Sequence, residues 1–406
     1  MTEAALPRPP GGEPAPRPDG AGGGRPLAGL RVIELAGHLP AQLAAMYLAD
    51  FGADVIRVTP PRPARPRRPQ VERRARALDR GKRALALDLK TEAGRAAFYR
   101  LVDTADVLIE CFRPGTAARL GADYPTLAAR QPRLVYCSLT GYGQSGPYRD
   151  LPGHDVNYLA LAGALLPRRP GDAPAVSPQM LADVLGAQQV LTGVLLALVA
   201  RQASGRGQHV DVALHDAALS LMAGLAPELL YGEPPPTHAA AITTGGEAVP
   251  CYGVYPAADG YFTLGCLEEW TWANFCRAVG RDDLIPAQFA TGAAGERVRA
   301  ELERLFRART RGEWFELLAA HEVACAPVRS LAEALADPAT AARGMAPLVD
   351  DPTHGHLRQI GAAPLLTHTP AGTPRPAPTP GQDTAAILAE LGYSVQDVAS
   401  LMGSEE

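Results

Sequence analysis

Residues 29–60 contain two short apolar segments on either side of an apolar helix-forming stretch, and this pattern restricts the fold more than any other feature of the chain. The three segments read GLRVIELA (29–36), AQLAAMYLADFGA (41–53) and DVIRVTP (54–60). A strand, a helix and a second strand within about 30 residues form a βαβ unit. The two strands of such a unit run in the same direction, so the sequence predicts a parallel sheet.

The same plan continues along the chain. Further strands are predicted at RALALDLK (83–90), DVLIECF (106–112) and LVYCSLTGYG (134–143), with a helix opened by Thr91 after the first of them. We therefore expect a large, doubly wound, Rossmann-like α/β domain. Residues 181–203 read as one long apolar helix. From about residue 250 the pattern changes to two strands around a turn at Asp259-Gly260, followed by helices, and this predicts a smaller α+β domain.

The chain divides into four regions on this reading. A Pro/Gly-rich tail over 1–26 is expected to be disordered. The first part of the large α/β domain covers 27–225, and the small α+β domain covers 226–330. A linker and the C-terminal segment occupy 331–406. A length of 406 residues also exceeds the usual size of a domain with a single hydrophobic core, which supports two domains.

Composition excludes several classes of protein. Hydrophobic residues make up 47% and charged residues 20%, as in soluble globular proteins, and the formal net charge of −4 gives no overall attraction to nucleic acid. We expect no membrane association, since no apolar run reaches the roughly 20 residues that a membrane span needs. The six Cys form no CxxC pair, which predicts reduced thiols in a cytoplasmic protein and no zinc site. The N-terminus has no apolar signal-peptide core.

An arginine-rich stretch follows the second predicted strand. Between Arg62 and Arg83 there are nine Arg and Lys82, against Glu72 and Asp79. The stretch is either a solvated charged loop or a phosphate site, because open α/β sheets bind ligands beyond the carboxyl ends of their strands. The usual ATP phosphate loop, GxxxxGK[ST], does not occur.

Several motifs then fall into one order. PLAGLRVIELA (26–36), LADFGADVIRV (48–58), ADVLIECFRPGTAARLG (105–121), GHDVNYLALAG (153–163), LADVLGA (181–187) and GRGQHVDVAL (205–214) together resemble the family III CoA transferases, the CaiB/BaiF superfamily. The match runs from about residue 26 to the end. Within the family, GHD-[IV]-NY resembles the α-methylacyl-CoA racemase branch.

The resemblance implies a set of site residues. His154 and Asp183 correspond to the acid/base pair of the racemases, and Glu268 to a residue that supports the histidine. Asp155 and Tyr158 are placed near the pantetheine arm or the thioester. Contacts with CoA are implied for Arg57, Leu78, Asp79, Arg80, Gly81, Lys82, Arg83, Arg113 and Arg119. Taken singly, His154 fits a packed or surface histidine and Asp183 an ordinary helix N-cap.

The implied reaction suits these residue types. A thioester acidifies the hydrogen on its α carbon, and inversion needs one group to remove that proton and another to deliver one to the opposite face. Imidazole suits this work because its pKa is about 6.5, whereas an Asp carboxyl needs its pKa raised by burial. The resemblance therefore implies a 2-methylacyl-CoA thioester as the substrate, with no metal or redox cofactor. The family fold implies an interlocked homodimer, with the C-terminal segment returning to the large domain and Glu268 reaching the partner subunit's histidine.

Two other functions remain open. In a CoA transferase, Asp183 attacks the thioester and His154 is not needed; GG at 245–246 weakly resembles the glycine-rich loop of those enzymes. The third possibility is a protein that binds an acyl-CoA without turning it over. Three segments depart from the racemase pattern and keep these alternatives open: HLPAQ (38–42), VLGAQQ (184–189) and EEWTW (268–272). His38 belongs to the first of them.

Overall fold

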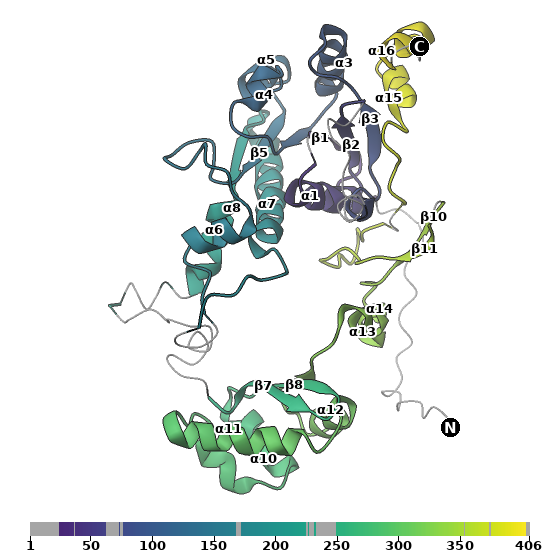
Figure 1. The fold of residues 1–406 in the computed structure, drawn as a ribbon. Coiled ribbons are helices and arrows are strands. Elements are labelled where there is room, and N and C mark those ends of the chain that lie inside the picture. Colours follow the sequence, from purple (N-terminus) through teal and green to yellow (C-terminus); the bar gives the residue numbers. More distant parts are fainter. Residues whose placement is uncertain are drawn as a thin grey trace. The chain divides into compact units, whose positions relative to one another are not determined.

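The computed structural model describes residues 24–35, 37–61, 73, 76–167, 172–224, 226, 231–232, 249–352, 354–372 and 375–402. These residues form two compact units (Figure 1). The first draws on both ends of the chain and comprises the described parts of 1–153, 182–217 and 335–406; the second comprises those of 154–181 and 218–334. Most of the predicted disordered tail, most of the arginine-rich stretch and the GG at 245–246 lie outside the described residues.

A six-stranded parallel sheet forms the centre of the first unit. Its order is β3-β2-β1-β4-β5-β6, which confirms the predicted doubly wound α/β fold. The strands are β1 (Arg31–Leu35), β2 (Asp54–Thr59), β3 (Arg83–Ala86), β4 (Val107–Glu110), β5 (Val135–Thr140) and β6 (His209–Ala213). Parallel strands covered on both faces consist of nearly continuous apolar residues, and this is why the sequence pattern located them.

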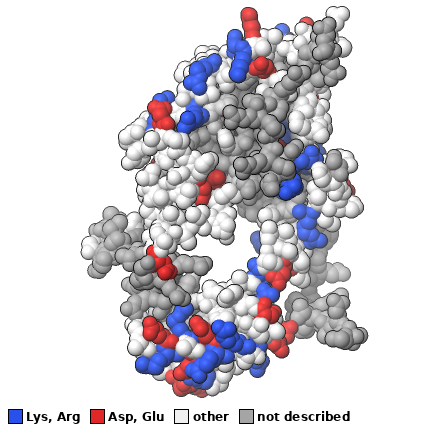
Figure 2. Space-filling view, in the orientation of Figure 1, with Lys and Arg blue, Asp and Glu red and all other residues white. Residues whose placement is uncertain are grey.

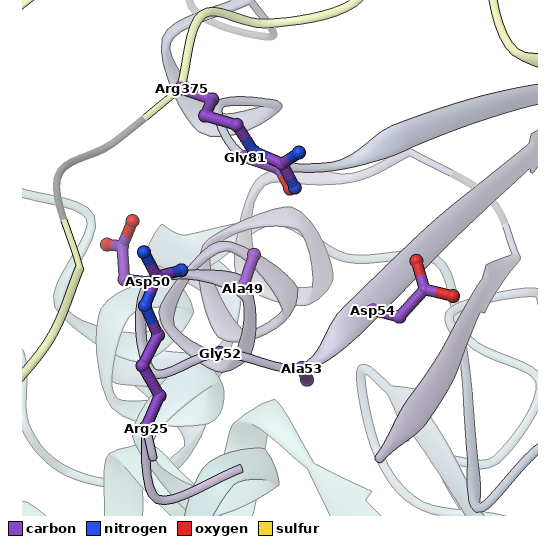
Figure 3. A pocket seen from close by; sticks show the side chains of 8 residues that line it. All are labelled: Arg25, Ala49, Asp50, Gly52, Ala53, Asp54, Gly81 and Arg375. Atoms are coloured by element: carbon purple, nitrogen blue, oxygen red, sulfur yellow. The ribbon is translucent and has the colours of Figure 1, made fainter. Parts of the chain in front are cut away.

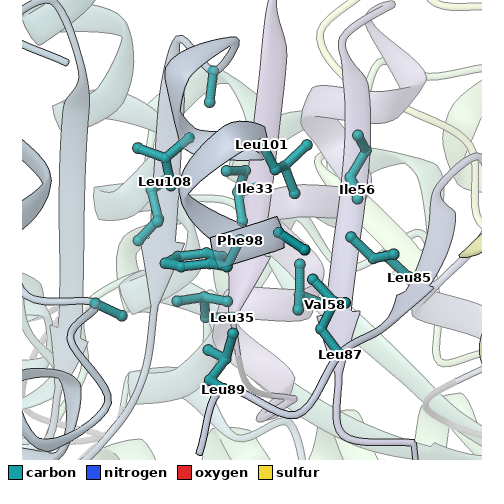
Figure 4. Packing of buried hydrophobic residues seen from close by; sticks show 14 of the residues in the cluster. Ile33, Leu35, Ile56, Val58, Leu85, Leu87, Leu89, Phe98, Leu101 and Leu108 are labelled. Carbon is teal, nitrogen blue, oxygen red and sulfur yellow. The ribbon is translucent and has the colours of Figure 1, made fainter. Parts of the chain in front are cut away.

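Three helices cover one face of this sheet and share a core with it. They are α3 (Glu92–Asp103), α5 (Tyr124–Arg130) and α15 (Thr384–Glu390). Phe98 and Leu101 of α3 lie against Ile33 and Leu35 of β1 (Figure 4), and all four side chains are buried. Thr91 caps α3 as predicted, with its Oγ1 accepting the Gly94 N–H at 3.0 Å.

The long helix α7 (Leu181–Ser204) packs on β5 and β6, and two of its glycines make the contact possible. A Cβ on Gly186 would lie 2.3 Å from Leu214 Cδ2, and one on Gly193 would lie 2.6 Å from Val210 Cγ1. At the far end of the helix, Arg201 pairs with Asp106 at 3.0 Å. Side chains of neighbouring elements thus occupy the space that a Cβ would need at either position.

The length of α7 corrects one expectation from the sequence. This helix of 24 residues is long and apolar enough to cross a membrane by length and composition, and 39% of its apolar window is buried inside the structure. The prediction that no apolar run is long enough was therefore wrong. Gln188, Gln189 and Thr192 interrupt the apolar residues of this helix, and for this reason the helix was not counted as an apolar run.

The C-terminal segment closes the exposed edge of the sheet. The Ala84 N–H donates to Asp383 Oδ2 at 2.8 Å, and the Ala86 N–H donates to Thr384 Oγ1 at 3.0 Å. These bonds satisfy backbone groups that edge strand β3 would otherwise leave open to another chain. The remaining elements of the first unit are α1 (Leu39–Asp50), α4 (Thr116–Arg119), α8 (Leu214–Ser220), α14 (Pro338–Ala342), β10 (Leu348–Asp351), β11 (Gly355–Arg358) and α16 (Val395–Met402).

The second unit contains a three-stranded antiparallel sheet with helices packed against it. Its strands are β7 (Tyr252–Ala257), β8 (Gly260–Gly265) and β9 (Cys325–Pro327). The register pairs Ala257 with Gly260, so the turn residues are Ala258 and Asp259, one position before the predicted pair. The helical elements are α6 (Asp155–Leu161), η1 (Leu221–Gly224), α10 (Glu269–Ala278), η3 (Asp282–Ala287), α11 (Gly292–Phe306), α12 (Arg311–Ala319) and α13 (Leu331–Ala336).

Aromatic residues build the core of the second unit. Phe275 stacks on Trp272 with ring centroids 5.3 Å apart and on Phe306 at 5.9 Å. The Trp272 indole N–H is satisfied by the carbonyl of Leu284 at 3.1 Å, as a buried indole requires. On the face of α10 and α11 seen in Figure 2, acidic and basic side chains intermix.

Candidate active site

The strand order places the ligand crevice of the first unit. Connections leave β1 toward β2 on one side, and β4 lies on the other side, so the order reverses between β1 and β4. In open α/β sheets, ligands bind outside the carboxyl ends of the two strands at such a point. Here those ends lead into His38, the N-cap of α1, and into the loop 111–115 before α4. We call this side of the sheet the carboxyl edge and the opposite side the amino edge.

Asp183 lies at the carboxyl edge. Gly186 is next to Leu139, near the end of β5, whereas Arg201 contacts Asp106 just before β4 begins. Helix α7 therefore runs opposite to the strands, and its first turn stands over their carboxyl ends. Asp183 is the third residue of that helix, not its N-cap, and is half-buried. The positive end of the helix dipole favours its charged carboxylate.

A buried network of ion pairs holds several residues that were predicted to contact CoA. Lys82 Nζ lies 2.6 Å from Glu34 Oε2 and 3.3 Å from Asp79 Oδ1, and Arg57 pairs with the same Asp79. Gln42 adds its backbone carbonyl, 3.1 Å from Lys82 Nζ. Two cations and two anions balance each other. Because the loss of one partner leaves an uncompensated buried charge, these residues stabilise the fold, and their contacts with CoA stay predictions.

Arg57 nevertheless keeps part of its donor set open within this network. Its Nε and the Glu34 Oε1 are buried without a hydrogen-bond partner among the described residues, and they face each other at 4.0 Å. Each group is too far from the other for a hydrogen bond and close enough for attraction between charges.

Arg80 and Arg83 serve connections within the first unit. Arg80 Nη2 pairs with Asp50 Oδ2 at 2.7 Å, and its Nη1 donates to the Ile360 carbonyl at 2.6 Å. Burial raises the pKa of Asp50, and the Arg80 guanidinium opposes that rise. Arg83 lies at the start of β3 and bridges Asp54 to Glu390 of α15. Leu78 is half-buried, and Gly81 has a φ of +73°, which suits glycine.

A hollow of about 170 Å³ occurs at the amino edge, away from Asp183. In Figure 3, the Arg375 side chain points toward Gly81 and the Arg25 guanidinium lies beside Asp50. Both carboxylates that line the hollow already form ion pairs, Asp50 with Arg80 and Asp54 with two other arginines. It is lined by Arg25, Ala49, Asp50, Gly52, Ala53, Asp54, Gly81 and Arg375.

Arg113 and Arg119 differ from the other predicted CoA contacts because both are exposed. Arg113 belongs to the loop after β4, and its carbonyl accepts the Thr116 N–H at 3.0 Å. Arg119 ends α4, and its Nη2 donates to Thr116 Oγ1 at 2.9 Å. Both guanidinium groups can therefore meet a phosphate without breaking a buried pair.

Cys111 is the thiol nearest to this crevice. Burial raises the pKa of the Cys111 thiol to about 12, and the negative charges of Glu34 and Glu110 add to the rise. The thiol is consequently protonated at neutral pH and is a poor nucleophile. A hydrogen bond between this thiol and the His38 backbone joins the loop after β4 to the start of α1.

In the second unit, two of the predicted catalytic side chains are exposed at helix N-caps. His154 is the N-cap of α6, and its N–H donates to Asn157 Oδ1 at 3.0 Å. Glu268 is the N-cap of α10, just after β8, and its carbonyl accepts the Thr271 hydroxyl at 2.9 Å. Both residues have extended backbone, and both side chains are exposed.

Asp155 and Tyr158 follow His154 on α6 and are buried, with 9% and 6% of their surface exposed. Asp155 is in the first turn of the helix, where a carboxylate is favoured. His154 belongs to the second unit and Asp183 to the first, and their pairing across one ligand stays a prediction.

Comparisons with known proteins agree on the family. The model of CoA-transferase family III matches residues 27–384. The chain is 33% identical over 386 residues to a succinate–glutarate CoA-transferase of Agrobacterium fabrum, covering 90% of this chain and 96% of the relative. It is 34% identical over 383 residues to an α-methylacyl-CoA racemase of Mus musculus, covering 92% and 96%. Racemases and transferases thus resemble it to a similar degree.

A solved structure supports the same conclusion. The crystal structure of a CaiB/BaiF family protein from Brucella suis matches with a TM-score of 0.77 and 31% identity. The match covers 91% of this chain and all of that chain (100%).

Proposed function

Since this chain belongs to CoA-transferase family III, we propose that it is a racemase or epimerase of 2-methylacyl-CoA thioesters. The observation that carries the proposal is the pair of ionisable groups in two helix starts: a half-buried Asp183 in the first turn of α7 and an exposed His154 at the N-cap of α6. CoA transferases of the family usually lack a histidine at the position that corresponds to His154, and the presence of His154 favours the racemase.

In the proposed reaction, one member of the pair removes the proton on C2 of the thioester. The electron pair moves into the carbonyl and forms an enolate, and the other member delivers a proton to the opposite face of C2. Ionised Asp183 is the acceptor in one direction and neutral His154 in the other. Backbone N–H groups in the first turn of α7 are candidate donors to the enolate oxygen, because the N-terminus of a helix favours negative charge.

The runner-up is transfer of CoA between carboxylic acids, and one observation favours it. The charged form of Asp183, favoured by the helix dipole, is the form that attacks a thioester carbonyl. CoA thiolate then leaves and a mixed anhydride forms; the thiolate attacks the aspartyl carbonyl, and the first acid departs. A second acid then attacks the aspartyl thioester, which expels CoA thiolate and forms a second mixed anhydride. The thiolate attacks the acyl carbonyl of that acid, and this step releases the new acyl-CoA and the Asp183 carboxylate.

We further propose an interlocked homodimer, in which Glu268 of one subunit supports His154 of the other. Exposed apolar residues on α7 support an association of this kind: Leu195, Leu196 and Val199 are 42%, 64% and 63% exposed. Sedimentation should give twice the mass of 42.7 kDa. All six cysteines are unpaired, as expected of a cytoplasmic protein, which is the location that we propose.

The deciding experiment follows hydrogen exchange at C2. The protein is incubated with a 2-methylacyl-CoA in heavy water, without any free acid, and mass spectrometry measures deuterium at C2. A racemase incorporates deuterium; His154→Ala should abolish this, and the exposed His321→Ala should not.

A transferase gives the opposite result. It would leave C2 unlabelled and exchange CoA only when a free acid is added. Hydroxylamine would react with the activated carbonyl of Asp183 and trap this residue. If neither activity occurs and acyl-CoA still raises the melting temperature, the chain binds acyl-CoA without turnover and both enzymatic proposals are wrong.

A further inference from the structure

A row of polar side chains crosses three strands near the carboxyl edge of the sheet. Glu110 ends β4, and the register places it opposite Ser138 of β5, which in turn lies opposite Asp211 of β6. Glu110 and Ser138 are only 3% exposed, although the residues on either side of them belong to apolar strands. A buried carboxylate costs free energy unless hydrogen bonds satisfy it, so the hydrogen bonds of Glu110 indicate its role.

Glu110 has two hydrogen-bond partners, and one belongs to the next loop. Its Oε2 accepts the Phe112 N–H at 2.8 Å, and Ser138 supplies a side-chain hydrogen bond. Ser138 Oγ is also 3.0 Å from His209 Nε2, and the His209 ring stacks on Tyr124 with centroids 5.2 Å apart. Ser138 therefore holds the Glu110 carboxylate in position, and the carboxylate in turn holds the backbone of the loop after β4.

Asp211 repeats this arrangement one loop further along. Its Oδ2 accepts the Gln144 N–H at 3.0 Å, and Thr140 Oγ1 accepts the Gly143 N–H at 2.9 Å. At the carboxyl ends of β4 and β5, acidic side chains thus bind the backbone of the loops that follow. In the described part of the chain neither Glu110 nor Asp211 forms an ion pair, in contrast to Asp54 and Asp106 at the amino edge.

The loop that Glu110 holds carries Arg113, whose exposed guanidinium is a predicted CoA contact. Arg113 is one residue beyond Phe112, so the Phe112 hydrogen bond limits the position of the arginine backbone. We propose that Glu110 is a positioning residue for CoA binding: it fixes the loop 111–115 through the Phe112 N–H and so presents Arg113 to a CoA phosphate. This inference rests on the proposed use of CoA.

The test compares CoA binding in four variants by calorimetry. Glu110→Ala removes the acceptor of the Phe112 N–H and should raise the Kd for CoA about tenfold, the equivalent of one hydrogen bond. Glu110→Gln keeps an acceptor oxygen for Phe112 and a donor for Ser138, so its Kd should stay within about threefold of the wild-type value. Ser138→Ala, which leaves Glu110 in place but unsupported, should lie between these two variants.

Asp106→Ala is the matched control. Asp106 stands just before β4, at the amino edge, where its carboxylate also accepts a backbone N–H, that of Arg31, at 3.0 Å. Its loss should lower the melting temperature and leave the Kd for CoA unchanged. If Glu110→Ala does not fold, Ser138→Ala and the rescue by glutamine still decide the matter.

The outcomes separate the two proposals. Wild-type protein that does not bind CoA overturns the proposed function. Wild-type protein that binds CoA, with Glu110→Ala and Ser138→Ala binding it equally well, overturns the positioning role alone. An equal loss of binding in Asp106→Ala and Glu110→Ala would also overturn that role, because it would mean that general destabilisation causes the loss.

Discussion

Two carboxylates at the amino edge of the six-stranded sheet, Asp54 and Asp106, pair with arginines, whereas Glu110 and Asp211, toward the carboxyl edge, bind loop backbone. Asp54 pairs with Arg31 at 2.9 Å, and Asp106 pairs with Arg201 at 3.0 Å. Glu110, in contrast, accepts the Phe112 N–H, and Arg113 of the loop after β4 and Arg119 of α4 are exposed. The amino edge neutralises its own charge. The carboxyl edge keeps guanidinium groups available for an anionic ligand, and substitutions at the two edges should differ accordingly.

The largest effect is expected at Asp183, on the carboxyl edge. Asp183→Ala should lower kcat by about 10³-fold or more, because this residue reacts in both proposed mechanisms. Its Kd for CoA should stay within about threefold of the wild-type value, since the phosphate contacts are elsewhere. Steady-state kinetics and calorimetry measure the two quantities. Retention of a tenth of the activity would remove Asp183 from the chemistry.

A large effect on stability is expected at Lys82, inside the buried ion-pair network. Lys82→Ala leaves the carboxylate of Glu34 buried without its closest cation and should lower the free energy of unfolding by about 3–5 kcal/mol. Denaturant titration measures this, with Lys90→Ala as the control at an exposed lysine. A change below about 1 kcal/mol in Lys82→Ala would show that the network contributes little.

A moderate effect is expected at Arg113. Arg113→Ala should raise the Kd for CoA about tenfold at low salt, and by less at high salt, because salt screens an exposed cation and its phosphate. Arg130→Ala is matched in size and exposure and pairs with Asp103, so its Kd should not change. Equal binding by wild-type protein and Arg113→Ala would show that the carboxyl edge offers no phosphate contact at this position.

The smallest effect concerns pH and Glu110. Burial raises the pKa of Glu110, and the charge of Asp211 adds to the rise, so the folded protein holds this proton more tightly than the unfolded chain. That contribution to stability is complete below the unfolded pKa and is lost as pH rises through the folded pKa. Glu110→Gln should therefore have a higher melting temperature than the wild type at neutral pH, and the difference should vanish at acid pH. A constant difference across this range would contradict the assignment.

Much of the fold could be predicted from the sequence because its signals are local. Strands β1 and β2 are apolar runs, since both faces of a parallel sheet are covered, and Thr91 begins a helix that the sequence predicts. The strand order could not be predicted, because it depends on packing between distant segments. Neither could the pairing of Arg57, Asp79 and Lys82: a family motif identifies positions near a ligand and does not say which charges neutralise each other.

The residues missed at the site had one visible signal. Glu110 interrupts the apolar run DVLIECF, and Ser138 interrupts LVYCSLTG. A polar residue inside a strand that should be buried calls for a partner, and the partner becomes known only when register sets β4 beside β5.

Hydrogen–deuterium exchange with and without CoA tests the central claim most directly, because it reports on both edges of the sheet in one experiment. We predict slower exchange on CoA binding in residues 37–42, 111–119 and 181–186, and no change in residues 51–54 and 104–106. Protection confined to the amino edge, or to the hollow beside Arg25 and Arg375, would contradict the account.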